Sequence, residues 1–142
     1  MSSEPLDSPT GWVADHVRKY VETDGARGHV FHGAPTLLIT TTGRRSGLPR
    51  RTALIYGRDD ERYLVVASNG GADDHPLWFH NLLAQPRVRI QVGADVFDAV
   101  ARPATGDERP RLWEIMAELW PNYTGYQRKA AREIPVVVIE RS

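Results

Sequence analysis

The spacing of apolar residues predicts an amphipathic helix near the start of the chain. Within residues 11–21, apolar side chains recur at roughly helical spacing, at Trp12, Val13, Val17, Tyr20 and Val21. Ser8 and Pro9 have the residue types of a helix N-cap and first turn, and Gly25 is typical of a helix end. We expect this helix to pack on the rest of the protein or to cover a pocket.

Apolar runs predict six strands after this helix. They cover residues 36–42, 52–57, 62–68, 87–92, 96–101 and 135–140. Residues 87–92 alternate polar and apolar side chains, as in a strand with one buried face. Gly93 and Ala94 then form a two-residue hairpin connection, and the polar run 58–61 forms a second tight turn. Strands that are neighbours in the sequence are therefore expected to pair as hairpins.

Three short helices are predicted to interrupt the strands, at residues 76–84, 108–119 and 124–132. The second is expected to have Asp107 as its N-cap, because Pro110 then falls in the first turn, where its missing N–H matters little. Its apolar face consists of Leu112, Ile115, Met116 and Leu119. Hairpin-linked strands with helices inserted between them favour an α+β fold, a small antiparallel barrel, over alternating βαβ units.

The composition is that of one globular domain. The chain has 142 residues, 41% of them hydrophobic, and we expect residues 1–10 to form a flexible tail before a single domain at 11–142. It has no cysteine, which excludes disulfides, thiolate metal sites and cysteine nucleophiles. We find no signal peptide or membrane-spanning run. We therefore expect a cytoplasmic protein with at most peripheral membrane contact through its N-terminal helix.

An arginine-rich turn follows the first predicted strand. It carries two arginine pairs, Arg44–Arg45 and Arg50–Arg51. Gly43 and Gly47 are expected to take positive φ angles, so that successive N–H groups aim at one point. Arginine adds planar forks that grip phosphate or carboxylate oxygens. The formal net charge of the chain is +0, and without these four arginines acidic residues would outnumber basic ones by four. The turn therefore indicates a local anion site.

Other interpretations of this turn are a solvated loop and a nucleic-acid contact. The pI near 7.0 and the shortness of the basic patch weigh against nucleic acid. The chain has neither a Walker loop nor a GxGxxG motif, and it lacks the Gly-x-Ser-x-Gly elbow of serine hydrolases. His29 and His32 are three residues apart without a nearby acidic ligand, so we predict no metal site there.

The second candidate segment begins where strand 62–68 ends. Its sequence Ser68-Asn69-Gly70-Gly71 leads shortly into helix 76–84. Such a junction supplies unpaired N–H groups and a hydroxyl for the polar edge of a planar ligand. Trp78 and Phe79 would wall that ligand, and the alternative is that both rings pack in the core.

The third candidate segment holds three aromatic residues around the proline that separates the last two predicted helices. They are Trp120, Tyr123 and Tyr126. A phenol beside a hydride acceptor can donate a proton, and aromatic side chains stack on fused rings. The alternative is ordinary packing at a helix–helix junction.

Taken in order, these segments resemble the deazaflavin-dependent nitroreductase family, split β-barrel proteins that bind coenzyme F420, and in particular its F420H2-dependent quinone reductases. The resemblance runs from about Pro35 to the C-terminus. It rests on the motifs Thr40–Arg50, Ala67–Ala72, His75–Leu82, Trp120–Tyr123 and Ile134–Val137. It implies a split barrel like that of FMN-binding proteins, with flanking helices, and an enzyme that uses reduced coenzyme F420.

The resemblance also implies site residues. The phosphate and acidic tail of the cofactor would be held by Arg44, Arg45, Ser46 and Arg50. The rest of the cofactor would be lined by Arg51, Thr52, Ala53, Leu54, Ile55, Val66, Ala67, Ser68, Asn69, Leu77, Trp78, Phe79, His80, Asn81 and Tyr123. Tyr123 would be the first candidate for proton donation or substrate orientation and Tyr126 the second, with Ser68 also near the substrate.

Two departures from the family pattern bear on substrate choice. Family members commonly carry lysine where Arg45 stands, so that contact should survive with different geometry. Some nitroimidazole-reducing members have tyrosines where Ile55 and Trp120 occur here. This difference speaks against nitro-prodrug reduction but not against cofactor binding.

The implied activity is hydride transfer from reduced coenzyme F420 to quinones, enones, lactones or other electron-poor small molecules. One alternative is an FMN-dependent oxidase or reductase on a similar barrel, in which the same arginines would hold a single phosphate. Another is a carrier that binds coenzyme F420 without turnover. We expect a small-molecule substrate, no nucleic-acid partner, no metal, and a monomer or weak homodimer.

Overall fold

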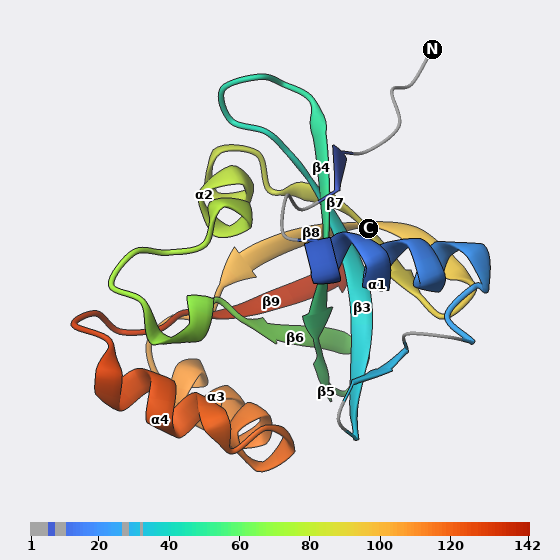
Figure 1. Ribbon diagram of the computed structural model, residues 1–142. Coiled ribbons are helices and arrows are strands. Elements are labelled where there is room, and N and C mark those ends of the chain that lie inside the picture. Colours follow the sequence, from blue (N-terminus) through green and yellow to red (C-terminus); the bar gives the residue numbers. More distant parts are fainter. Residues whose placement is uncertain (1–5, 8–10, 27–28, 32) are drawn as a thin grey trace.

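The computed structural model describes residues 6–7, 11–26, 29–31 and 33–142. In chain order the elements are β1 Leu6–Asp7, α1 Gly11–Glu22, β2 Val30–Phe31, β3 Ala34–Thr42, β4 Pro49–Ile55, β5 Gly57–Asp59, β6 Arg62–Val66, the 3-10 helix η1 Asn69–Gly71, α2 Leu77–Ala84, β7 Arg87–Val92, β8 Asp95–Pro103, α3 Glu108–Leu119, α4 Asn122–Lys129 and β9 Val136–Arg141 (Figure 1).

The strands form one strongly curved sheet in the order β1-β4-β3-β7-β8-β9-β6-β5, with β2 paired to β3. All of these pairings are antiparallel except β1 with β4. Strands β4 and β5 lie near opposite ends of this order, yet only Tyr56 separates them in the chain. The chain itself therefore closes the sheet into a barrel, and the prediction of an α+β antiparallel barrel is confirmed.

Side-chain alternation divides the core between the inside and the outside of this barrel. On β9, Val137 and Ile139 point inside, where the main cluster also holds Leu37, Ile39 and Phe79. Val136 and Val138 point outside, into a second cluster covered by α3 and α4. Both faces of β9 are thus buried, which explains its uninterrupted apolar run.

Helix α1 packs on the outer face of β3 and β4. Val17 and Tyr20 are fully buried in a third cluster with Leu38. The Tyr20 hydroxyl donates to the carbonyl of Thr36 at 3.0 Å and accepts the N–H of Gly93 at 2.6 Å. The apolar face of α1 is therefore used in packing, as expected. None of the helices in the described ranges combines the length and the apolar content that a membrane crossing requires.

Several element predictions are confirmed to the residue, and others are shifted. Strand 87–92 and helix 108–119 have the predicted bounds. Helix 124–132 instead spans Asn122–Lys129, and the strand predicted at 52–57 begins at Pro49 and ends at Ile55. Strands β1, β2 and β5 and the 3-10 helix η1 were not predicted. Residues 58 and 59, expected in the tight turn 58–61, belong to β5, which pairs with β6. Ser8 and Pro9 lie outside the described residues.

The residues expected to form a flexible tail contain one element of the sheet, because β1 pairs with β4 at Leu6 and Asp7. Asp107 stands at the predicted N-cap position of α3, but its side chain makes no capping hydrogen bond. Instead, the Glu108 carboxylate accepts the N–H of Thr105 at 3.3 Å. This bond joins the first residue of α3 to the turn that precedes the helix.

Candidate functional site

The arginine turn is the loop of the hairpin formed by β3 and β4, which projects beyond the barrel beside α2 (Figure 1). The N–H of Gly43 donates to the carbonyl of Leu48 at 2.8 Å, and the N–H of Gly47 donates to the carbonyl of Gly43 at 2.8 Å. Gly47 has a φ of +72°, as predicted. The prediction for Gly43 is wrong, because Gly43 has no positive φ. A Cβ atom at Gly43 would lie 2.7 Å from the Ser46 Oγ and 3.1 Å from the carbonyl oxygen of Leu48, so a larger residue there would crowd the turn.

The arginines of this turn are poorly neutralised by the protein. Arg44, Arg45 and Arg50 are exposed. Within the part of the chain that the structure describes, no carboxylate forms an ion pair with any of the three. Three like charges in one hairpin repel one another, and an anionic ligand would relieve this repulsion.

Asn81 of α2 fixes the base of the turn. Its side-chain oxygen accepts the backbone N–H of Arg44 at 3.1 Å, and its amide nitrogen donates to the Thr41 hydroxyl at 3.2 Å. Thr41 and Asn81 are only 2% and 6% exposed, so these bonds are shielded from water. Asn81 therefore attaches the start of the turn to α2.

The strand that follows the turn presents its residues to two different faces. Leu54 pairs with Leu37 and packs against the cluster inside the barrel. Ala53 pairs with Leu38 and packs against the cluster beneath α1. By alternation, Thr52 shares the face of Leu54, whereas Arg51, Ala53 and Ile55 share the other. The predicted lining Arg51–Ile55 is thus divided between two faces.

The segment after β6 forms a turn whose backbone N–H groups converge. Ser68 is in the right-handed helical region (φ −74°, ψ −36°), while Asn69 and Gly70 have φ angles of +48° and +65°. Consecutive right- and left-handed residues form an anion-binding concavity called a nest. In the described part of the chain, the N–H groups of Ser68, Asn69 and Gly70 have no acceptor. We call these three residues the Ser68–Gly70 nest.

The two predicted site residues before the nest belong to the core. Ala67 lies in the cluster inside the barrel, and Val66 lies in the cluster beneath α3 and α4. Ser68 is half-buried and Asn69 is exposed. The first residues of this segment that reach the surface are therefore those of the nest.

Arg132, in the loop between α4 and β9, holds this segment and was missed by sequence reasoning. Its guanidinium donates to the carbonyls of Ala67, Ser68 and Ala72 at 3.2, 3.0 and 3.0 Å, and to the His75 Nδ1 at 3.0 Å. No motif signals this role, because the contacts join residues about 57 to 65 positions apart in the sequence.

Helix α2 contributes one buried ring and several partly exposed side chains. Phe79 is 4% exposed and belongs to the barrel core, which confirms the core-packing alternative for this ring. Trp78 and His80 are half-buried, and Leu77 is 72% exposed. The His75 ring lies 4.8 Å from the Phe79 ring and 5.7 Å from the His80 ring.

The aromatic residues of α4 differ in burial. Tyr123 is 5% exposed, with its ring 6.4 Å from Trp113 and 6.2 Å from Tyr126. Burial raises the pKa of the Tyr123 hydroxyl, so Tyr123 is a weaker proton donor than a solvated phenol. Tyr126 is half-buried, and its backbone carbonyl lies 3.0 Å from where a Gly71 Cβ would stand. Helix α4 therefore packs directly on η1.

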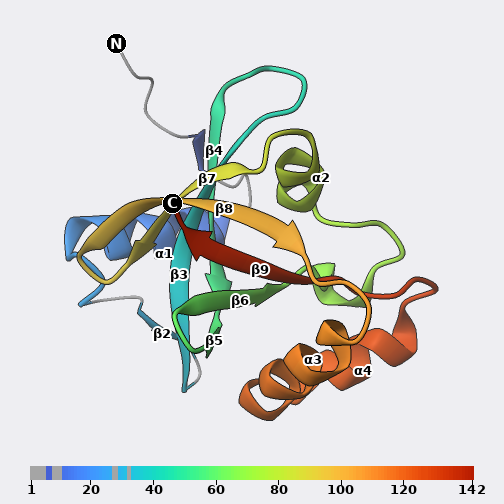
Figure 2. The same ribbon diagram turned by 180° about the vertical axis from the view of Figure 1, so that it is seen from behind.

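The structure brings the three predicted segments together along one side of the molecule. The arginine turn contacts α2 through Asn81, and the nest contacts the loop after α4 through Arg132. In Figures 1 and 2 the turn, α2, η1 and α4 follow one another down the same side. Segments far apart in the sequence thus lie along one side of the molecule.

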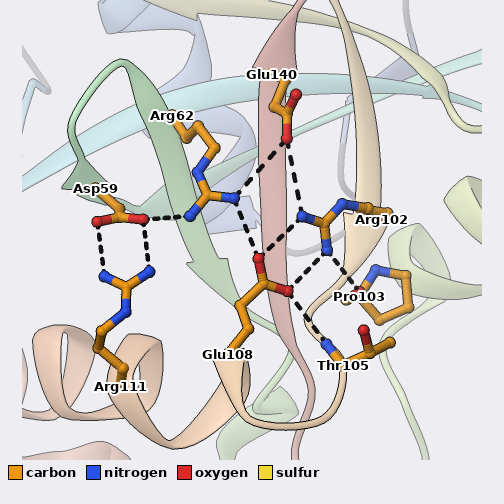
Figure 3. Close-up of polar contacts among 8 residues, drawn as sticks. All are labelled: Asp59, Arg62, Arg102, Pro103, Thr105, Glu108, Arg111 and Glu140. Atoms are coloured by element: carbon orange, nitrogen blue, oxygen red, sulfur yellow. Dashed lines mark hydrogen bonds and ion pairs between the residues drawn. The ribbon is translucent and has the colours of Figure 1, made fainter.

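A second charged region lies at the other end of the molecule, between β5, β6, β8 and α3 (Figure 3). Asp59 accepts two hydrogen bonds from Arg111, at 2.9 and 3.1 Å, and also pairs with Arg62. Glu108 accepts from Arg102 at 2.9 and 3.0 Å and from Arg62 at 3.1 Å. We call this the α3 ion-pair network. It lines a shallow, open depression whose arginines are already neutralised, so it is no candidate for anion binding.

The histidines give no metal site. His32 lies outside the described residues. Among the residues that are described, no three histidine or carboxylate side chains lie close enough together to hold a metal ion.

Comparisons with known proteins show which family and fold this chain shares. The family model described as F420H(2)-dependent quinone reductase matches residues 12–141. An F420H(2)-dependent quinone reductase of Mycobacterium tuberculosis is 45% identical over 130 residues, which cover 89% of this chain and 87% of that protein.

Among solved structures, an F420-H2 dependent reductase is 41% identical with a TM-score of 0.69, covering 75% of this chain and 94% of its own. A chain solved as a domain-swapped dimer is 39% identical with a TM-score of 0.72, covering 94% of this chain and 100% of its own. The heme storage protein HutZ of Vibrio cholerae, at 18% identity and a TM-score of 0.60 over 75% of this chain and 81% of its own, shares the fold.

Proposed function

This chain belongs to the F420H(2)-dependent quinone reductase family, and on that premise we propose that the arginine turn and the Ser68–Gly70 nest form its cofactor site. The chain is an oxidoreductase that uses reduced coenzyme F420 to reduce quinones. The turn would hold the phosphate and the acidic tail of the cofactor. The nest, with the exposed part of α2, would hold its ring system.

The observation that carries this proposal is the set of unpaired guanidiniums in the turn. The cofactor carries a phosphate and carboxylates, and these are the groups that arginine binds with two parallel hydrogen bonds. Arg44, Arg45 and Arg50 are exposed on one hairpin without carboxylate partners in the described part of the chain. The residues present therefore fit the charged end of the cofactor.

The side chains of β4 alternate between two faces of the sheet, and one of these faces looks toward the proposed site. Arg50 pairs with Thr41, and Thr41 binds Asn81 of α2. By alternation Arg50, Thr52 and Leu54 share the face that looks toward α2. We propose that these residues contact the cofactor, whereas Arg51, Ala53 and Ile55 face α1.

When bound, reduced coenzyme F420 supplies a hydride. Reduction of a quinone to a hydroquinone takes this hydride and one proton, and one of the two tyrosines of α4 would donate that proton. Tyr126 is half-buried and lies against η1, whereas Tyr123 is buried with a raised pKa. We therefore propose Tyr126 as the proton donor and Tyr123 as the ring that packs behind it. Ser68 would orient the substrate at the edge of the nest.

Fluorescence titration with coenzyme F420 tests the site. Loss of one charge-assisted contact is worth about 1.5–3 kcal/mol, so Arg45→Ala should weaken binding roughly ten- to hundred-fold. The control is Arg89→Ala on β7, an exposed arginine that pairs with Asp98 at 3.3 Å. Equal affinities of wild type, Arg45→Ala and Arg89→Ala would refute the assignment of the turn.

Turnover separates the remaining alternatives. Steady oxidation of the reduced cofactor by menadione, lost in Arg45→Ala, is the expected result. Tight binding without turnover across quinones and enones would indicate a carrier, and tighter binding of FMN than of coenzyme F420 would indicate a flavin enzyme. If Tyr126→Phe turns over like wild type, the proton-donor assignment is wrong even though the class holds.

We also propose that the chain is a monomer or a weak homodimer. The solved relative that forms a domain-swapped dimer supports the dimeric form. Light scattering across a hundred-fold range of concentrations should show a mass that rises with concentration. A constant tetrameric or larger mass would contradict this proposal.

A further inference from the structure

Arg132 directs nearly all of its hydrogen-bonding capacity at one loop. A guanidinium has five N–H donors. Four contacts from these donors reach the carbonyls of Ala67, Ser68 and Ala72 and the ring of His75. In the described part of the chain, Arg132 forms no ion pair. The positive charge of the Arg132 guanidinium is therefore stabilised by the backbone carbonyl dipoles of this loop.

These contacts bear on the shape of the nest. Asn69 has a φ of +48°, in the left-handed region that asparagine adopts more readily than most residues other than glycine. Arg132 holds the carbonyls of the two residues before Asn69 on its own side. The N–H groups of Ser68, Asn69 and Gly70 donate to no acceptor among the described residues and stay available. Fixing the carbonyls thus fixes the direction of the N–H groups.

Other contacts hold this loop from within and at its ends. Inside it, the N–H of Gly71 donates to the carbonyl of Ser68 at 2.9 Å, and the Asn69 side-chain amide donates to the carbonyl of Asp74 at 3.1 Å. The N–H of Ala67 donates to the carbonyl of Pro135 at 3.0 Å, and the N–H of Ala131 donates to the Asp73 carboxylate at 3.0 Å. Arg132 reaches the carbonyl of Ser68 itself, inside the nest. Among the described residues, Arg132 is therefore the side chain from outside this loop that forms a hydrogen bond inside the nest.

Arg132 also fixes the protonation state of His75. A guanidinium only donates, so the His75 Nδ1 must accept, and the proton of the ring must sit on Nε2. The groups that face this ring are Arg132, His80 and Asp74. Burial lowers the pKa of His75, Arg132 and His80 lower it further, and Asp74 opposes them. The ring is thus a neutral N–H donor beside Phe79.

We infer that Arg132 is a positioning residue for the proposed cofactor site: it holds the Ser68–Gly70 nest and a neutral His75 in the arrangement that binding requires. The inference rests on the proposed function for its consequence in binding and turnover. The part of the inference that concerns structure alone, that Arg132 holds this loop in place, does not depend on any ligand.

The first experiment uses the ligand-free protein and the variants Arg132→Gln and Arg132→Lys. The matched control is Arg109→Gln. Arg109 binds the carbonyl of Ile134 and covers Trp113, and it makes no contact with residues 67–75, which Arg132 holds. NMR should show a higher pKa for His75 in Arg132→Gln, since the lowering effect of the guanidinium is gone, and faster amide exchange at residues 68–70. Arg132→Lys keeps the charge and should shift His75 less. Arg109→Gln should change neither signal.

The second experiment measures steady-state kinetics with reduced coenzyme F420 and menadione. Misplacement of a binding group by about 1 Å can reduce activity by roughly a hundred-fold. In Arg132→Gln we therefore expect KM for the cofactor to rise at least about ten-fold, with partial recovery in Arg132→Lys and no change in Arg109→Gln.

The outcomes separate the two proposals. An unchanged His75 titration and unchanged amide exchange in Arg132→Gln would overturn the inference, whatever the kinetics. A loosened loop with an unchanged KM would overturn it too, because the loop would then not position the cofactor. If wild type itself binds no coenzyme F420 while the NMR signals shift as expected, the proposed function fails and the control of the loop by Arg132 stands.

Discussion

Two arginine-rich regions of this molecule use the same side chain in opposite ways. In the α3 ion-pair network, Arg62, Arg102 and Arg111 share Asp59, Glu108 and Glu140 (Figure 3). In the hairpin between β3 and β4, Arg44, Arg45 and Arg50 form no ion pair with a carboxylate within the described ranges. In the first arrangement each arginine has a carboxylate partner, and the ion pairs join α3 to the sheet. The second leaves charge for a ligand.

This difference shows that arginine content alone does not locate an anion site. The depression over the α3 ion-pair network is lined by Arg62 and Arg111, yet Asp59 and Glu61 line it as well. Its carboxylates compete with any incoming anion. What distinguishes the hairpin is that Arg44, Arg45 and Arg50 have no carboxylate partner among the described residues, while Asn81 supports its base.

The largest expected effect comes from removing two charges of the hairpin at once. Arg44→Ala with Arg45→Ala should weaken binding of coenzyme F420 by at least about a hundred-fold, because two charge-assisted contacts are lost. The melting temperature should stay within about 2 °C of wild type, since exposed residues without partners contribute little to stability. Fluorescence titration and calorimetry measure the two quantities. A large drop in melting temperature would show that these arginines are structural after all.

The converse change is made in the α3 ion-pair network. Glu108→Gln removes the negative charge that Arg62 and Arg102 share. We expect the free energy of unfolding to fall by about 1–3 kcal/mol with unchanged cofactor affinity. Urea denaturation measures the stability. Glu114→Gln, an exposed glutamate of the same helix, is the control and should change neither quantity.

A smaller effect is expected where the hairpin is attached to α2. Asn81→Ala removes the bonds to Arg44 and Thr41 and leaves a buried hydroxyl without its donor. We expect a stability loss of about 1–2 kcal/mol and a several-fold weaker affinity for the cofactor. Leu83→Ala, at an exposed position of α2, serves as the control. Lost stability with wild-type affinity would separate the hairpin from its proposed support.

The smallest effect concerns pH. Hydrogen bonds from Arg102, Thr105 and Arg62 lower the pKa of Glu108 to about 2, and Arg111 and Arg62 lower the pKa of Asp59. Carboxylates with lowered pKa stabilise the folded state above their unfolded pKa, at about pH 4, and lose this contribution as pH falls toward the folded value. The stability difference between wild type and Glu108→Gln should therefore shrink from pH 5 to pH 2. A constant difference would mean that the charge of Glu108 is irrelevant.

Much of the fold could be predicted from the sequence where the pattern is local. The alternation at 87–92 and the apolar face of α3 gave elements with correct bounds, because one face of each is buried and the other is solvated. The strand β9, buried on both faces, was found from its apolar run. Strands β1 and β2 escaped prediction, since two-residue strands have no periodicity to detect.

The sequence indicated which segments form the candidate site, but not which of their side chains face one another. The arginine turn and the Ser68–Asn69 segment stand out by residue type. The division of Arg51–Ile55 between two faces follows from the register with β3, which the sequence does not state. The role of Arg132 depends on contacts across more than fifty residues, and the burial of Tyr123 depends on how α4 packs on α3.

The most direct test of the central claim compares two ligands in one titration series. The ligands are coenzyme F420 and the deazaflavin fragment that lacks its phosphate and glutamate tail, and the proteins are wild type and Arg45→Ala. If the unpaired arginines hold the anionic end, Arg45→Ala should weaken binding of the complete cofactor roughly ten- to hundred-fold and leave the fragment unchanged. An equal loss for both ligands, or no loss for either, would contradict the account.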